Sequence, residues 1–266
     1  MTKYAIFLLA LLTLCSGLLA QDFALKQLEQ SPRHQEWVKV KSGNRTIRAF
    51  VVYPQKAVAT TAVVVIHENR GLTAWVRSFA DQLAGAGYLV IAPDLLSDFD
   101  SLHSHTSTFE NEDAARNAIY QLNPDNVAAD LNAVQAFIAK DPACNGKTAV
   151  IGFCWGGAQS FRMATYNKEV KAAMVFYGGA PEDSLVYGQI TTPVYGFYGG
   201  NDQRINAGIP KAAQRMKAAG KVYEAVTYPG AGHAYMRLGD DPAGAEENKA
   251  ARAESWVRIK EILAKL

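Results

Sequence analysis

The sequence predicts an α/β fold in which a mostly parallel central sheet is covered by helices on both faces. Three observations predict it: continuous apolar segments of strand length, helical patterns between them, and glycine-rich or polar turns directly after them. A strand that is apolar throughout is typical of a sheet covered on both faces, and strands that alternate with helices favour parallel pairing. No Pro- or Ser-rich linker divides residues 21–266, so we expect one domain there.

The elements follow one another in a regular order. Trp37–Lys41 and Thr46–Val52 alternate outward and inward residues around Ser42-Gly43-Asn44-Arg45, which predicts a hairpin. Further strands are predicted over Ala62–His67, Tyr88–Pro93, Thr148–Phe153, Lys171–Tyr177, Pro193–Tyr198 and Lys221–Tyr228. Helices are predicted over Thr73–Ala84, Asn111–Leu122, Pro124–Lys140, Ala158–Tyr166, Ala207–Ala219 and Glu246–Leu266, whereas Leu95–Glu110 is irregular and polar.

The N-terminus has the pattern of a secretory signal peptide. Lys3 precedes an uncharged, mostly apolar run over Tyr4–Leu14, and a small residue, Ala20, stands before polar Gln21. A membrane anchor is the alternative, but a membrane span needs roughly 20 clearly apolar residues. We expect cleavage after Ala20, export to the periplasm or the medium, and no stable membrane anchor afterwards.

The composition is that of an ordinary globular protein. The chain has 266 residues, 49% of them hydrophobic and 20% charged, with a net charge of +2. That charge gives no reason to expect nucleic acid as a partner. The sequence leaves open whether the protein is a monomer or a small homo-oligomer.

The segment Thr148–Gly157 predicts a nucleophile elbow, in which a sharp turn between a strand and a helix carries the reactive side chain. Gly152 and Gly156 stand two residues on either side of Cys154, where a side chain would collide with neighbouring backbone. Cysteine occupies the position where serine is usual. A helix N-terminus favours an anion, which suits a thiolate. The alternative is a tight turn with a buried, inert cysteine.

An acid and a base follow the elbow at two later strand ends. Asp202 comes after the strand Pro193–Tyr198, and His233 comes after Lys221–Tyr228. The order Cys, Asp, His is that of the α/β-hydrolase fold. Cys154 would attack a carbonyl, His233 would exchange the protons, and Asp202 would orient the imidazole. Taken singly, Asp202 would be a capping residue and His233 a loop residue.

The loop His67-Glu68-Asn69-Arg70-Gly71 follows the first buried strand. In this fold such a loop supplies an oxyanion donor, so the backbone N–H of Asn69 is expected beside that of Trp155. Glu68 would then point toward Cys154 and, as a like charge, disfavour the thiolate at rest. The alternative is a surface ion pair between Glu68 and Arg70. A zinc site is not predicted, because no second histidine follows four residues after His67.

The remaining reactive side chains have simpler interpretations. Cys144 and Cys154 lie at opposite ends of a strand, roughly 20 Å apart by strand rise, so a disulfide between them is not expected. We assign His103 and His105 no acidic or sulfur partner that would complete a metal site. We interpret them as residues of a lid and predict no metal.

From about Trp37 to Leu266 the chain resembles the dienelactone hydrolase family. The resemblance is carried by Gly152-Phe153-Cys154-Trp155-Gly156-Gly157, by Asp202, by Gly232-His233 and by the Glu68 loop. It implies an α/β-hydrolase fold, ester or lactone hydrolysis, and no cofactor. It assigns the nucleophile, acid and base to Cys154, Asp202 and His233, and the partner of the resting thiol to Glu68.

Arginines bind the substrate carboxylate in the enol-lactone members of this family. One of them matches Arg237, four residues after the histidine. The other is missing, because this chain has Leu96-Ser97-Asp98 at its place. This departure leaves the substrate undefined. Arg70 and Arg204, with the His103 and His105 loop, are candidates for a different wall that recognises acids.

The sequence therefore predicts an exported hydrolase that cleaves a small carboxylic ester or lactone through a Cys-His-Asp triad and a thioester. The alternative is a non-catalytic exported binding protein for small organic acids, which would bind an acid tightly without turnover. A thiol redox sensor is a further class, but it would need a resolving cysteine nearer than Cys144.

Overall fold

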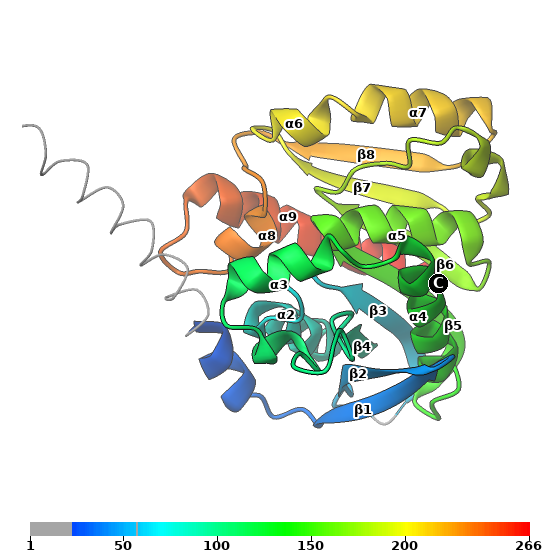
Figure 1. Ribbon diagram of the computed structural model, residues 1–266. Coiled ribbons are helices and arrows are strands. Elements are labelled where there is room, and N and C mark those ends of the chain that lie inside the picture. Colours follow the sequence, from blue (N-terminus) through cyan, green and yellow to red (C-terminus); the bar gives the residue numbers. More distant parts are fainter. Residues whose placement is uncertain (1–22, 57) are drawn as a thin grey trace, which may run out of the picture.

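The computed structural model describes residues 23–56 and 58–266, so the predicted signal peptide over residues 1–20 lies outside the described part. Eight strands form one sheet in the order β1-β2-β4-β3-β5-β6-β7-β8 (Figure 1). The strands are β1 (Gln35–Ser42), β2 (Arg45–Val52), β3 (Thr60–Ile66), β4 (Leu89–Pro93), β5 (Cys144–Phe153), β6 (Val170–Phe176), β7 (Val194–Gly199) and β8 (Tyr223–Tyr228).

The sheet is parallel from β4 through β8 and antiparallel at its other edge. β2 pairs antiparallel with both β1 and β4, and the hairpin closes at the pair Ser42 and Arg45. Gly43, in that turn, has a φ of 55°, which glycine adopts without strain. The predicted hairpin and the mostly parallel sheet are confirmed.

The helices lie in two layers. They are α2 (Ala74–Gly85), α3 (Glu112–Ile119), α4 (Pro124–Ile138), α5 (Trp155–Tyr166), α6 (Gln203–Asn206), α7 (Ile209–Ala218), α8 (Tyr235–Leu238) and α9 (Glu246–Leu263). Short 3₁₀ turns occur at η1 (Thr106–Thr108) and η2 (Leu185–Gln189), and residues 23–29 are helical. Helices α2, α8 and α9 pack on one face of the sheet, and α4, α5 and α7 pack on the other (Figure 1).

Strand β3 shows why the central strands are apolar throughout. Val63 and Val65 belong to the core beneath α2 and α9, whereas Val64 and Ile66 belong to the core beneath α4 and α5. Successive side chains of a strand point to opposite faces, so a sheet covered on both sides buries every one of them.

Several helix and strand boundaries in the structure differ from the predicted ones. The predicted helix Ala207–Ala219 was wrong in its first turn, because the chain forms the separate short helix α6 before Gly208 and begins α7 only at Ile209. Strand β5 begins at Cys144, four residues earlier than predicted. Both Cys144 and Cys154 are free thiols, as expected from their places at the two ends of this strand.

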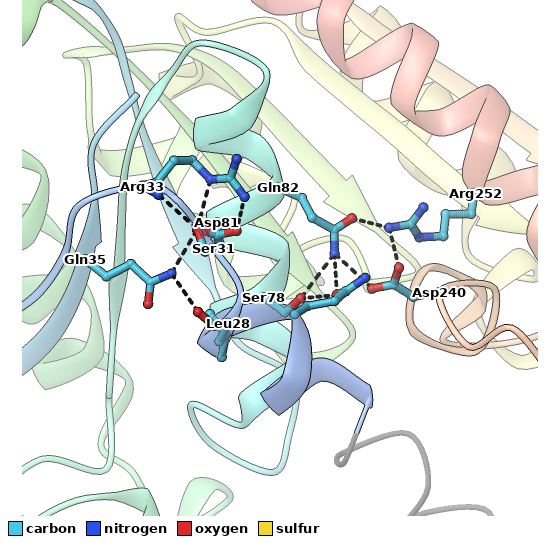
Figure 2. A network of polar contacts seen from close by, with 10 residues as sticks. Leu28, Ser31, Arg33, Gln35, Ser78, Asp81, Gln82, Asp240 and Arg252 are labelled. Carbon is cyan, nitrogen blue, oxygen red and sulfur yellow. Dashed lines mark hydrogen bonds and ion pairs between the residues drawn. The ribbon is translucent and has the colours of Figure 1, made fainter. Parts of the chain in front are cut away.

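A polar network holds the segment after the predicted cleavage site against the domain (Figure 2). Asp81 of α2, only 2% exposed, accepts hydrogen bonds from Arg33 Nε at 3.0 Å and Gln35 Nε2 at 2.9 Å. Gln82, the next residue, donates to Asp240 Oδ2 at 3.1 Å, and Asp240 pairs with Arg252 of α9 at 2.6 Å. One helix thereby ties both ends of the described chain together. No helix among the described residues is long and apolar enough to cross a bilayer.

Candidate active site

Cys154 stands on the sharp turn between β5 and α5. Its backbone has φ 54° and ψ −113°, a conformation that residues with a side chain rarely adopt. Its N–H donates to Phe176 O at 3.0 Å, which holds the turn against the end of β6. β5 lies between β3 and β6, where the strand order changes direction, so the turn opens into the crevice in which such sheets bind ligands.

Glycines make this turn possible. A Cβ added to Gly152 would lie 1.9 Å from Gly156 O, and one added to Gly156 would lie 2.3 Å from His67 O. Both are contacts with backbone, which cannot rotate away as a side chain can. The predicted reason for the two glycines therefore holds in the structure.

His233 lies between Cys154 and Asp202. Its Nε2 is 3.2 Å from Cys154 Sγ, and its Nδ1 is 2.5 Å from Asp202 Oδ2. The Asp202 side chain is 6% exposed and the His233 side chain is 32% exposed. The carboxylate is thus buried behind the imidazole, and the imidazole edge reaches the sulfur.

Asp202 also caps a helix. Its Oδ1 accepts a hydrogen bond from the backbone N–H of Ile205 at 3.4 Å, at the start of α6. Capping and contact with His233 use different oxygens, so the two interpretations of Asp202 are compatible. The cap fixes the carboxylate toward His233.

Two backbone amides point at the sulfur. The N–H groups of Trp155 and Asn69 both hydrogen-bond to the Cys154 side chain and favour its thiolate. These are the two groups expected to form an oxyanion hole. The loop carrying Asn69 is held by the buried His67, whose ring stacks on Trp155 with centroids 5.6 Å apart.

The tautomer of His67 follows from its neighbours. The backbone N–H of Leu95 donates to Nε2 at 3.2 Å, so the proton lies on Nδ1, which donates to Glu68 O at 2.7 Å. Burial lowers the pKa of His67 and keeps the ring neutral. The ring therefore links the loop after β3 to the loop after β4 without carrying charge.

The thiol of Cys154 is neutral at rest. Burial raises its pKa from the ordinary 9.0 to about 11, with the Glu68 carboxylate as the second cause. The two amides and the charge of Arg204 act in the opposite direction but do not outweigh them. A thiol of this kind needs a base to become a nucleophile.

Glu68 is paired with Arg237 rather than with Arg70. Arg237 Nε donates to Glu68 Oε2 at 2.9 Å, and the two side chains are 23% and 7% exposed. The Glu68 charge raises the pKa of Arg237 above its ordinary value. Glu68 is close enough to Cys154 to act on its pKa, but its direct partner is the arginine.

The other two candidate arginines form no ion pair with Glu68. Arg70 pairs with Glu112 at the start of α3. Arg204, in α6, is exposed, and its charge lowers the pKa of the thiol. At the place of the missing arginine, Leu96 is buried and Ser97 Oγ accepts from the backbone N–H of Arg48 at 2.9 Å.

The two histidines after β4 have different surroundings. The expectation that His103 lacks an acidic partner was wrong, because its Nδ1 lies 2.9 Å from Asp100 Oδ1. Its ring stacks on Phe109 with centroids 4.2 Å apart. His105 lines a cavity beside Arg48. Across the described residues, no three His, Cys, Asp or Glu side chains gather in a way that would hold a metal ion.

Tyr177 is a site residue that the sequence reasoning missed. It is fully buried, has φ 39°, and its ring meets that of His233 edge-on with centroids 5.1 Å apart. Among the described residues its hydroxyl has no hydrogen-bond partner. Its position at the carboxyl end of a buried strand was the available signal, because site residues gather there.

Comparison with known proteins gives a consistent result. The profile of the dienelactone hydrolase family matches residues 47–266. A Methylorubrum extorquens protein named as a carboxymethylenebutenolidase is 31% identical over 210 residues, covering 74% of this chain and 71% of the relative. A Saccharolobus solfataricus protein of the same name is 27% identical over 254 residues, covering 85% of this chain and 96% of the relative.

Solved structures share the fold. A Klebsiella pneumoniae structure named as a dienelactone hydrolase has a TM-score of 0.77 at 24% identity, covering 88% of this chain and 99% of its own. A Pyrobaculum calidifontis esterase has a TM-score of 0.63 at 17% identity, covering 91% of each chain. The family profile and the relatives together show that this chain belongs to the dienelactone hydrolase family and is a hydrolase of carboxylic esters or lactones.

Proposed function

We propose that this protein is an exported hydrolase in which Cys154 is the nucleophile, His233 the general base and acid, and Asp202 the residue that orients the imidazole. The observation that carries the proposal is the continuous contact from Asp202 Oδ2 through the His233 ring to Cys154 Sγ, with distances of 2.5 Å and 3.2 Å. Such a chain of contacts supplies a base to a thiol whose own pKa is too high for reaction.

Acylation begins when the substrate carbonyl enters beside the sulfur. His233 Nε2 takes the thiol proton, the sulfur attacks the carbonyl carbon, and the negative oxygen is stabilised by the N–H groups of Asn69 and Trp155. His233 then gives its proton to the leaving alkoxide. The alcohol departs, or stays attached in a lactone, and the acyl group remains on Cys154 as a thioester.

Deacylation uses the same groups in reverse. His233 takes a proton from water, the hydroxide attacks the thioester, and the same two amides stabilise the second oxyanion. The thiolate leaves and recovers its proton from His233. Asp202 stabilises the imidazolium in both halves of the reaction.

Glu68 and Arg237 form the recognition part of the site in this proposal. A substrate carboxylate near Arg237 would compete with Glu68 for the guanidinium. The Glu68 carboxylate would then be released from its partner, while His233 remains the group that takes the thiol proton. The substrate class proposed is therefore an ester or lactone with a nearby carboxylate, like that implied by the carboxymethylenebutenolidase relatives.

Export rests on the N-terminal pattern Lys3, Tyr4–Leu14 and Ala20. Fractionation of cells expressing the full chain, with N-terminal sequencing of the product, tests this point. A product that begins at Gln21 in the exported fraction is expected. An intact Met1 terminus in the cytosol would contradict it.

The catalytic assignment is tested with an ester, lactone and thioester panel on wild type, Cys154→Ala and the iodoacetamide-treated enzyme. We expect hydrolysis to fall to background in the variant and in the treated enzyme, with an unchanged circular dichroism spectrum. Cys144→Ala is the matched control, because that thiol lies at the opposite end of β5 and its loss is expected to leave turnover intact. More than a trace of turnover in Cys154→Ala would refute the mechanism.

A further inference from the structure

A second cavity lies outside the site at Cys154. It has a volume of about 390 Å³ and lies among the β1–β2 hairpin, the start of α2 and the loop after β4. Its wall includes Trp37, Arg48, Leu72, Arg77 and Asp94. None of the residues of the proposed catalytic machinery lines it.

Two guanidinium groups dominate this cavity. The Cζ atom of Arg48 lies 3.8 Å from the centroid of the Trp37 ring, and that of Arg77 lies 5.7 Å from it. Within residues 23–56 and 58–266, neither arginine has an ion-pair partner within 4.0 Å, and Arg77 Nε is buried without a hydrogen bond. Burial and the neighbouring charge of Arg48 lower the pKa of Arg77. Two like charges held together, one with an unsatisfied donor, indicate a place for an anion.

Asp94 is the acidic side chain in the cavity wall, and its carboxylate oxygens form their hydrogen bonds with residues other than Arg48 and Arg77. Its oxygens accept from the backbone N–H of Thr106 at 2.8 Å, from Thr106 Oγ1 at 2.7 Å and from the backbone N–H of Leu96 at 3.1 Å. The two guanidiniums and this carboxylate leave one excess positive charge, which a single negative charge neutralises. The cavity therefore matches a monoanion better than a dianion such as phosphate.

The remaining wall is mixed, because Trp37 and Leu72 are apolar whereas His105 and Ser107 are polar. The Trp37 side chain is 40% exposed, and Leu72 is buried at the start of the segment leading into α2. Arginine forks bind planar carboxylates with two hydrogen bonds, whereas an apolar wall favours a hydrocarbon body. We propose that this cavity binds an apolar monocarboxylate, whose carboxylate bridges Arg48 and Arg77 and whose body lies against Trp37 and Leu72.

Benzoate is the probe that tests this site, with acetate and inorganic phosphate for comparison. Binding is measured by calorimetry and by the indole N–H signals in NMR, with the Trp37 signal assigned from a Trp37→Phe variant. We expect benzoate to bind more tightly than acetate or phosphate and to shift the Trp37 signal.

Matched arginine variants separate this cavity from the catalytic crevice. We expect Arg48→Met and Arg77→Met each to weaken the benzoate binding that is read at the Trp37 signal at least tenfold, whereas Arg237→Met and the exposed Arg116→Met leave that binding unchanged. If Arg77→Met does not fold, Arg48→Met alone tests the proposal. Loss of binding in Arg237→Met but not in Arg48→Met would assign benzoate to the crevice at Cys154 and overturn the proposal. The proposal would also be overturned if phosphate bound more tightly than benzoate. It would be overturned as well if no benzoate binding were detected with millimolar protein and a 10-fold excess of benzoate.

Discussion

Replacing Glu68 by Gln removes a negative charge that acts on the Cys154 thiol. The pKa of Cys154 lies at about 11 against an ordinary 9.0, with burial as the largest cause and Glu68 as the second. The whole rise from 9.0 to about 11 corresponds to about 2.7 kcal/mol, and removing the Glu68 charge recovers only part of it, because burial is the larger cause. The uncompensated cation of Arg237 would act in the same direction. We therefore expect the pKa of Cys154 to fall below about 11 and to stay above its ordinary 9.0.

The consequence is measurable as reactivity. With a pKa of about 11, roughly one Cys154 thiol in a thousand is ionised at pH 8, and each further unit by which the pKa falls raises that fraction about tenfold. Because intrinsic nucleophilicity falls with pKa, the alkylation rate is expected to rise about three- to tenfold. Iodoacetamide labelling of Cys154, followed by peptide mass spectrometry from pH 6 to 10, compares the labelling rates of wild type and variant at each pH.

A control for this experiment is Glu224→Gln, which removes the same charge on β8, where the carboxylate contacts Arg258 at 4.0 Å. It is expected to leave the labelling rate of Cys154 unchanged, and Cys144 labelling serves as an internal reference. A labelling rate of Cys154 that stays the same or falls in Glu68→Gln would refute the electrostatic reasoning.

Three further perturbations have expected outcomes. Asp202→Asn keeps an oxygen that caps α6 but loses the charge beside the imidazole, so kcat on a p-nitrophenyl ester should fall by about 10²–10⁴ with little change in urea stability. Gly156→Ala places a Cβ 2.3 Å from a backbone oxygen, so the free energy of unfolding should fall by about 2 kcal/mol or more, whereas Gly179→Ala, with open space around it, should be nearly neutral in the same urea titration. Hydrogen bonds to Asp100 raise the pKa of His103, so its ion pair is present at low pH and is lost as pH rises through that raised pKa. Proteolysis of the 98–110 loop should accordingly speed up over that interval in wild type and show no such step in His103→Gln.

The fold was predictable because its physical cause is local and repeated. Both faces of the sheet are covered, so strands such as Ala62–Ile66 are apolar at every position and stand out from the polar turns. The ends of an element were harder to predict where pairing with a neighbouring strand decides them. Nothing in the polar run Asn145-Gly146-Lys147 marks it as strand, yet Cys144 pairs with Thr60 of β3 and extends β5 backward.

The candidate site was predictable to the extent that chain order fixes it. Cys154, Asp202 and His233 follow β5, β7 and β8, which run parallel in one sheet with only β6 between β5 and β7, so their meeting requires no long-range information beyond the strand order. The ion-pair partner of Glu68 could not be predicted from the strand order alone. Arg237 lies 169 residues further along the chain, and the sequence was compatible with an ion pair between Glu68 and either Arg70 or Arg237. Arg48 and Arg77 gave no signal at all, since each has an ordinary place on its own element.

The sharp turn at Cys154 is possible because Gly152 and Gly156 have no side chain, and a Cβ at either position would collide with backbone atoms. The backbone of Cys154 between them has φ 54°. The turn depends on these two glycines and not on the sulfur, so a serine hydroxyl at the same position would face the same imidazole and the same two amides. The geometry of the turn is therefore compatible with either sulfur or oxygen as the nucleophilic atom.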